Sequence, residues 1–172
     1  LARFDCREVA AAALLPAAAT LVKMAKRYSK LTGEERRDLL WSAIKSESLS
    51  DLRAALTSTG VEAHTRHEAT QLTLFMTAAE AGKKKSLDTL LDWFERRRVL
   101  RPKGWIDLRT DDDDARTALM LAAGNGHVDC VRSLLRYGAD AALLDGKGKS
   151  ALQLARDRKK QPVVDVLEAH MN

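Results

Sequence analysis

The residue types that most often carry catalysis or bind metals are few in this chain. His64 and His67 stand three residues apart in the stretch HTRH, a helical spacing at which both rings could face one metal ion. A zinc site needs further nitrogen or sulfur ligands, and no Cys, Asp or third His stands nearby in a ligand pattern. His127 has neither a nucleophile nor an orienting acid beside it, so it is not a candidate base. We therefore interpret His64 and His67 as solvated loop residues and expect no metal site.

Other catalytic patterns are also absent from the sequence. The stretch GKGKS, from Gly146 to Ser150, has the wrong spacing for a phosphate-binding loop. There is no nucleophile elbow and no pair of carboxylates in an apolar setting, and Cys6 and Cys130 form no pattern of disulfides or metal ligands. The sequence therefore predicts a protein that is not an enzyme, with no cofactor and no small-molecule substrate. A regulatory domain of an enzyme would need a neighbouring catalytic chain, which these 172 residues do not contain.

A basic stretch that ends in a tryptophan is the strongest candidate contact for a polyanion. Arginine and lysine neutralise phosphates, and an exposed indole ring can stack on a base, so this composition suits RNA or an acidic partner. In the alternative interpretation, Trp105 and Ile106 cover the end of a helix and the basic side chains are only solvated. The sequence leaves both interpretations open. The candidate contact residues are Arg96, Arg97, Arg98, Arg101, Lys103 and Trp105.

The stretch from Thr117 to Asp140 predicts two short helices joined by a tight turn. Gly126 suits the positive φ of a helix C-cap between them, and Thr117 is a natural N-cap for the first helix. Each helix is shorter than the roughly 12–15 residues at which an isolated helix is stable in water, so the pair must pack against other units. The apolar positions at helical spacing are Ala118, Leu119, Leu121, Ala122 and Ala123, then Val128, Val131, Leu134 and Leu135.

A second copy of this pattern follows 33 residues later. Asp145, Gly148, Ser150, Leu152 and Ala155 take the places of Asp112, Ala115, Thr117, Leu119 and Ala122. This period and content resemble the ankyrin repeat, whose pattern runs D-x-x-G, T-P-L-H-x-A-A, G-H, V-x-x-L-L and G-A-D. Ala115, Ala118 and Met120 depart from it, where the family has Gly, Pro and His. The matching residues are Thr117, Leu119, Ala122, Ala123, Gly126, His127, Val131, Leu134, Leu135, Gly138, Ala139 and Asp140.

Two weaker copies precede these and complete the expected domain. The resemblance implies an all-α fold, an ankyrin-type helix-turn-helix solenoid of about four repeats with an N-terminal capping helix. We expect an N-terminal helical cap at 1–32 and a repeat domain at 33–172. The repeat domain divides into units at about 33–67, 68–94, 112–144 and 145–172, with an insertion at 95–111. Two further packing sets support this division: Phe75, Ala78, Ala79, Gly82, Leu87, Leu90 and Leu91, and before them Leu40, Ala43, Leu52 and Leu56.

The beginning of the chain carries two less specific expectations. The apolar stretch from Val9 to Val22 is interpreted as part of a capping helix, and a leftover targeting sequence is the alternative. Asp38 is the expected N-cap of the first helix of the first unit, which runs through Trp41. No apolar run reaches the roughly 20 residues needed to span a membrane, so we expect no membrane span.

The resemblance also implies where a partner would bind. In the ankyrin family, contact residues usually come from the tips of the turns and the exposed side of the first helix of each unit, which together form a concave face. We therefore expect a non-enzymatic scaffold for protein–protein interaction, with one or more protein partners. One acidic tip next to one basic tip implies a partner of mixed charge, or several partners. Carried over position by position, the partner-binding residues are Asp113, Asp114, Arg116, Asn125, Lys147, Lys149 and Arg158.

The charge balance supports an alternative function. The chain has 29 Lys and Arg against 24 Asp and Glu, a net charge of +5, and a pI of about 9.4. A basic protein of this kind could be a structural subunit of a large RNA–protein assembly, such as a mitochondrial ribosome, with the basic insertion on RNA phosphates. Phosphate contacts would make binding steeply salt-dependent, whereas an apolar groove would not. We expect an intracellular protein, and the choice between cytoplasm and mitochondrion stays open, as does the identity of the partner.

Overall fold

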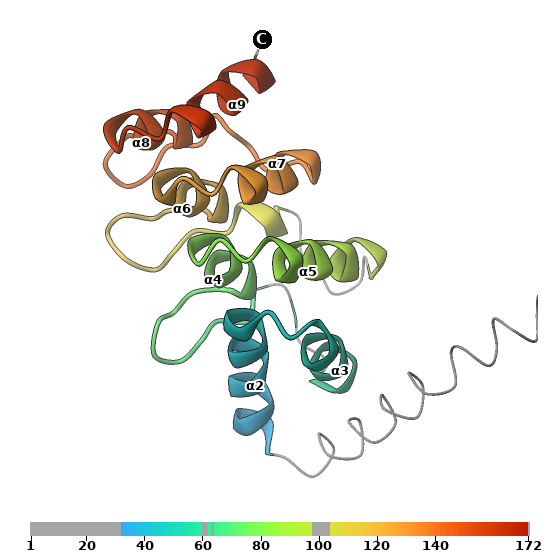
Figure 1. Ribbon diagram of the computed structural model, residues 1–172. Coiled ribbons are helices and arrows are strands. Elements are labelled where there is room, and N and C mark those ends of the chain that lie inside the picture. The colour runs from blue at the N-terminus through green and yellow to red at the C-terminus, as the bar shows by residue number, and fades with distance from the viewer. Residues whose placement is uncertain (1–31, 60–61, 63, 98–103, 172) are drawn as a thin grey trace, which may run out of the picture.

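The computed structural model describes residues 32–59, 62, 64–97 and 104–171, and these ranges hold eight α-helices and one short 3-10 helix. Successive α-helices form helix–turn–helix pairs (Figure 1). The expected N-terminal cap, apart from residue 32, lies outside the described residues. The helices are α2 (Gly33–Ser46), α3 (Leu49–Thr59), α4 (Leu74–Glu80), α5 (Lys84–Arg96), η2 (Trp105–Asp107), α6 (Ala118–Asn125), α7 (Val128–Arg136), α8 (Ala151–Asp157) and α9 (Gln161–Met171).

The pairs stack into two columns of helices. Helices α2, α4, α6 and α8 lie on one another, and α3, α5, α7 and α9 form the second column beside them (Figure 1). The apolar stripes point between the columns, where Val131 and Leu134 are fully buried. Ala122 and Ala123 are also fully buried, and their small side chains let α6 lie close to its neighbours. The loops before α4, α6 and α8 project on the side of the first column (Figure 1).

Hydroxyl side chains begin the helices of the first column, as the repeat pattern predicts. The Oγ1 atoms of Thr73 and Thr117 and the Oγ atom of Ser150 each accept a hydrogen bond from the backbone N–H three residues on, at 3.3, 3.4 and 3.3 Å. Each bond satisfies one of the N–H groups that a helix start leaves without a partner. Gly126 ends α6 with a φ of 83°, the positive value expected from the sequence.

The first helix begins earlier than the prediction from the sequence. Asp38 is wrong as its N-cap, because it lies inside α2 and its side chain is exposed. Thr32 caps the helix instead, and the Glu35 carboxylate accepts the Thr32 backbone N–H at 2.7 Å in a reciprocal capping box. The packing positions named for this unit, Leu40, Ala43, Leu52 and Leu56, are all buried.

Trp105 is a core residue, which decides between its two interpretations. Its side chain is 6% exposed, and its ring packs edge-on against Phe75 with the centroids 5.0 Å apart. Phe94 lies 6.2 Å away at the end of α5, and Ile106 is also buried. The prediction of Trp105 as a contact for RNA or an acidic partner is therefore wrong, because a ring buried between α4 and α5 cannot stack on a ligand.

The three projecting loops are joined to one another by arginine side chains. We call residues 64–73, 108–117 and 140–150 the first, second and third fingers, and each is closed by one antiparallel bridge, Arg66 with Thr73, Arg109 with Thr117 and Leu144 with Ser150. The Arg66 guanidinium donates to the backbone oxygen of Arg109 at 2.7 Å, and the Arg109 guanidinium donates to that of Leu144 at 2.7 Å. Each finger is therefore fixed to the next one.

Candidate functional site

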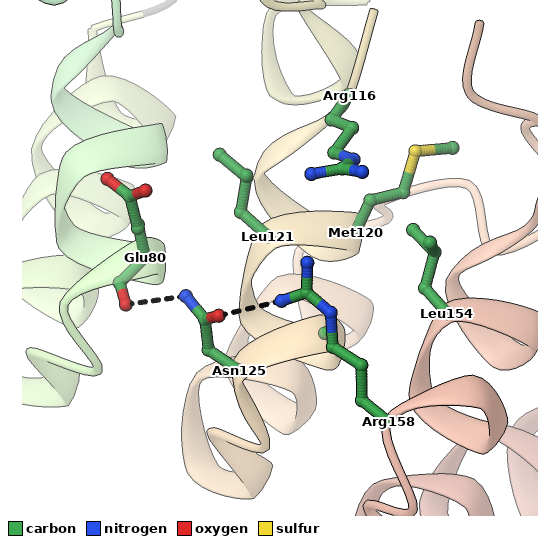
Figure 2. Close-up of a pocket in the computed structure, with 8 residues that line it drawn as sticks. Glu80, Arg116, Met120, Leu121, Asn125, Leu154 and Arg158 are labelled. Atoms are coloured by element: carbon green, nitrogen blue, oxygen red, sulfur yellow. Dashed lines mark hydrogen bonds between the residues drawn. The ribbon is translucent and has the colours of Figure 1, made fainter. Parts of the chain in front are cut away.

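A depression opens between the first-column helices α4, α6 and α8, and it is the best candidate for a binding site. It encloses about 340 Å³ of empty volume, part of which is open solvent. In Figure 2, Asn125 lies between the backbone oxygen of Glu80 and the guanidinium of Arg158, so residues of three successive units meet there. We call this depression the inner pocket. Its lining residues are Glu80, Arg116, Met120, Leu121, Gly124, Asn125, Leu154 and Arg158.

Arg158 follows α8 and its guanidinium reaches back across α6. Its Nη1 atom donates to the Asn125 Oδ1 atom at 3.1 Å (Figure 2). The side chain lies over Gly124, where a Cβ atom would stand only 3.1 Å from Nη1. The glycine therefore makes room for the guanidinium, and the amide of Asn125 holds it in place.

Asn125 and His127 extend this connection to the preceding unit. The Nδ2 atom of Asn125 donates to the backbone oxygen of Glu80 at 3.0 Å (Figure 2), and the His127 Nε2 atom lies 3.0 Å from the same oxygen. The His127 ring fits against Gly82, where a Cβ atom would come within 2.5 Å of it. The side chains at the lower edge of the inner pocket are thus ordered by bonds across three units, and they need little rearrangement to meet a ligand.

Arg116 enters the inner pocket from the second finger and is held by two carboxylates. Its Nη2 atom lies 2.9 Å from Asp114, and its Nε atom faces the buried Asp145 carboxylate at 3.8 Å. Among the described residues, neither that Nε atom nor the Oδ2 atom of Asp145 has a hydrogen-bond partner, because the gap between them is too wide. The positive charge of Arg116 is therefore largely balanced within the protein.

The acidic and basic tips predicted to meet a partner are paired with each other. Asp114 of the second finger lies 2.7 Å from Lys147 of the third, and its backbone oxygen accepts the Gly146 N–H at 2.6 Å. The hydrogen bond from Lys147, followed by the charges of Arg116 and Arg158, holds the pKa of the Asp114 carboxyl below its ordinary value. This pairing cancels much of the contrast in charge between neighbouring tips.

The other two tip residues differ in what they offer to a partner. Lys149 is 2.5 Å from Asp157 and is also paired within the protein. Asp113 is exposed, and its side chain makes no ion pair within the part of the chain that the structure describes. Of the predicted partner-binding residues, the structure brings Arg116, Asn125 and Arg158 together in the inner pocket and leaves the rest on the fingers.

The basic stretch is only partly described. Arg96 and Arg97 are exposed at the end of α5, and the Arg97 guanidinium lies over the Trp93 ring at 3.8 Å. Arg98, Arg101 and Lys103 lie outside the described residues. The stretch therefore shows one cation–π contact within the protein, and its role toward a partner stays a prediction.

The structure also places the histidine pair. His64 lies 3.2 Å from the Glu62 carboxylate, and the His67 ring packs 5.2 Å from the Trp41 ring. Within the described ranges, no three side chains of His, Cys, Asp or Glu converge as a metal site would require. In those same ranges, no helix has the length and apolar composition that a membrane span needs.

The apolar floor of the inner pocket was not identified from the sequence. Met120, Leu121 and Leu154 form it, and Leu121 and Leu154 are 33 residues apart, so they occupy the same position in successive units. That shared apolar residue on the first helix of each unit was the available signal. From the sequence alone, Leu121 is interpreted only as part of the packing stripe.

Comparison with known proteins agrees with this architecture. A family model described as ankyrin repeats (3 copies) matches residues 75–172, which is more than half of the chain. The chain therefore belongs to the ankyrin-repeat family, and the prediction of an all-α helical repeat fold is confirmed. The match begins at Phe75, so the repeat status of the unit formed by α2 and α3 stays a prediction.

One curated relative shares a short segment with the chain. Protein HOS4 of Saccharomyces cerevisiae is 43% identical over 49 residues, which are 28% of this chain and 4% of HOS4. The matched segment is thus a small part of that much longer protein. Ankyrin repeats indicate a role in protein–protein interaction in general, and the particular partner is a matter for proposal.

Proposed function

We propose that this protein is a non-enzymatic scaffold that binds a protein partner on the face formed by α4, α6, α8 and the three fingers. The observation that carries the proposal is the inner pocket, with an apolar floor and an ordered polar rim in one depression. Partner sites commonly combine a desolvated apolar centre with a polar edge. The stacked helices hold this surface in place, so little conformational entropy is lost on binding.

The fingers contribute to this surface as a unit. Arg66 and Arg109 bond each finger to the next, and the contact between Asp114 and Lys147 joins the second and third fingers again. A partner therefore meets one continuous edge beside the inner pocket. The exposed Asp113 and the third-finger residue Leu144, which is 48% exposed, are open to it.

Site-specific photo-crosslinking in cells tests the proposal. A photoreactive amino acid is placed at Leu121 in the inner pocket, or at Lys147 on the third finger, and the crosslinked proteins are identified by mass spectrometry. The matched control carries it at Arg132, an exposed position on α7 in the other column. We expect a common partner at the first two positions and none at Arg132. Crosslinks to that partner only from Arg132 would place the interface on the opposite face.

The alternative function, a structural subunit of an RNA–protein assembly, depends on the basic stretch. The observation in its favour is that Arg96 and Arg97 are exposed. Replacing both with glutamine should reduce association with RNA and flatten its dependence on salt if these residues neutralise phosphates. Association that survives ribonuclease and moderate salt would instead support the protein-binding scaffold.

A further inference from the structure

We propose that the partner segment bound in the inner pocket carries an aspartate or glutamate side chain that pairs with Arg158, next to an apolar side chain on the floor. This inference rests on the proposed function and adds the chemistry of the partner. It follows from the charge state of the basic residues around the pocket, from the geometry of Arg158 and from the composition of the lining.

Arg158 differs from Arg116, the other basic residue that lines the pocket, and from the two lysines of the third finger in having no acid of its own among the described residues. Within the described residues, Arg116 pairs with Asp114, Lys147 also pairs with Asp114, Lys149 pairs with Asp157 and Arg156 pairs with Glu168. Arg158 is exposed and forms no ion pair in that part of the chain; its hydrogen bond goes to a neutral amide. The charge of Arg158 acts on Asp114 only without direct contact, so its guanidinium remains available to a carboxylate from outside.

The guanidinium of Arg158 is also oriented for such a partner. One N–H of Nη1 is directed to Asn125, and the group lies close to Gly124 near the end of α6. The other N–H groups remain to bind a carboxylate, which arginine can hold through two parallel hydrogen bonds. Because the side chain is already ordered, less conformational entropy is lost when the pair forms.

The lining of the pocket favours a carboxylate on a protein segment over a nucleic acid. Leu121, which is partly exposed, offers an apolar surface beside the charge, and the buried Met120 and Leu154 also line the pocket. Glu80 lies on the opposite side of the pocket and would repel the repeated phosphates of a nucleic acid strand (Figure 2). A single acidic side chain next to an apolar one would match both the charge of Arg158 and the apolar lining. A lysine or arginine further along the same peptide segment would suit Glu80.

Selection from a library of short random peptides displayed on phage tests the inference without a known partner. Wild-type protein, Arg158→Glu and the control Arg132→Glu are used as targets. We expect wild type and the control to select peptides with an acidic residue beside an apolar one. Arg158→Glu should lose the acidic preference. A peptide selected on wild type should lose affinity for a Leu121→Arg variant, which places the bound peptide in the pocket.

The affinity of one selected peptide then measures the pair directly. We expect Arg158→Gln to weaken binding on the order of tenfold, as for one desolvated charge pair. Changing the peptide's acid to its amide should weaken binding of wild type equally and should have little further effect on Arg158→Gln. Arg132→Gln should bind as wild type does. Thermal unfolding checks that each variant remains folded.

The outcomes separate the inference from the proposed function. Peptides that depend on Leu121 but show no acidic preference would overturn the inference and leave the scaffold function intact. Failure to select any peptide that depends on Leu121 would count against binding at this face, and so against both. A single-stranded RNA that displaces the peptides and binds through Arg158 would overturn the choice of a carboxylate.

Discussion

Replacement of Trp105 with alanine is the most direct test of how the insertion between the second and third units contributes to the fold. The ring is 6% exposed and lies between Phe75 and Phe94. A buried tryptophan removes about 200 Å² from water, which at about 25 cal/mol per Å² is worth about 5 kcal/mol. The loss is smaller where neighbouring side chains move into the cavity. We therefore expect the free energy of unfolding to fall by about 3–5 kcal/mol.

Urea unfolding followed by far-ultraviolet circular dichroism measures this change. Trp93→Ala is the matched control, because Trp93 is only half-buried on α5 under the Arg97 guanidinium. Its loss should cost less than that of Trp105, since part of the ring is already in water. Trp105→Phe should fall between wild type and Trp105→Ala, because it retains an aromatic contact with Phe75.

The reasoning would be refuted by a Trp105→Ala variant that loses less than about 1 kcal/mol, the typical effect of an ordinary substitution. A loss confined to RNA binding, with unchanged stability, would restore the exposed-contact interpretation of Trp105. A smaller dependence of the free energy of unfolding on urea concentration would show that the units on either side of η2 unfold separately.

Three further changes test other parts of the structure. Leu134→Ala empties the fully buried space between the columns and should cost about 2–5 kcal/mol in urea unfolding; an unchanged midpoint would contradict the helix register. Burial raises the pKa of the Asp107 carboxyl, although its Oδ1 atom accepts the Asp140 N–H, so its ionisation opposes folding above the raised pKa. Asp107→Asn should therefore unfold at a higher temperature than wild type at neutral pH, and the difference should vanish as pH falls below the ordinary aspartate pKa. Burial also raises the pKa of the Cys130 thiol to about 11, so in a Cys6→Ser background iodoacetamide should label native protein far more slowly than protein unfolded in urea; equal rates would show that Cys130 is accessible.

The sequence predicted the fold best where local signals agreed with the repeat. Between Thr117 and Asp140, the N-cap, the apolar stripe and the turn glycine all favour the same two helices, and the structure has them. At the first unit the prediction of Asp38 overlooked a stronger signal, because Thr32 followed by Glu35 is itself a capping-box pattern.

The candidate site was harder to predict because it depends on stacking. Asp114 and Lys147 are 33 residues apart, so the repeat period places them on adjacent tips, and their mutual pairing could have been inferred from that spacing. The burial of Trp105 could not be inferred in this way, because the spacing of residues does not show which aromatic rings the short helix η2 will pack against. The pocket floor combines Leu121 and Leu154 only after α6 and α8 have packed.

The arginine bonds between fingers give the stack a direction. Arg66 donates to the following finger and Arg109 repeats the same bond, but the equivalent position in the third finger is Leu144, which cannot donate. The side chains at this position therefore depend on the order of the units. If the second and third fingers were exchanged, Leu144 would take the place of Arg109 and the side-chain hydrogen bond between these two fingers would be lost. A designed protein that adds another unit after α9 would need Leu144→Arg to extend the same linkage to its new finger.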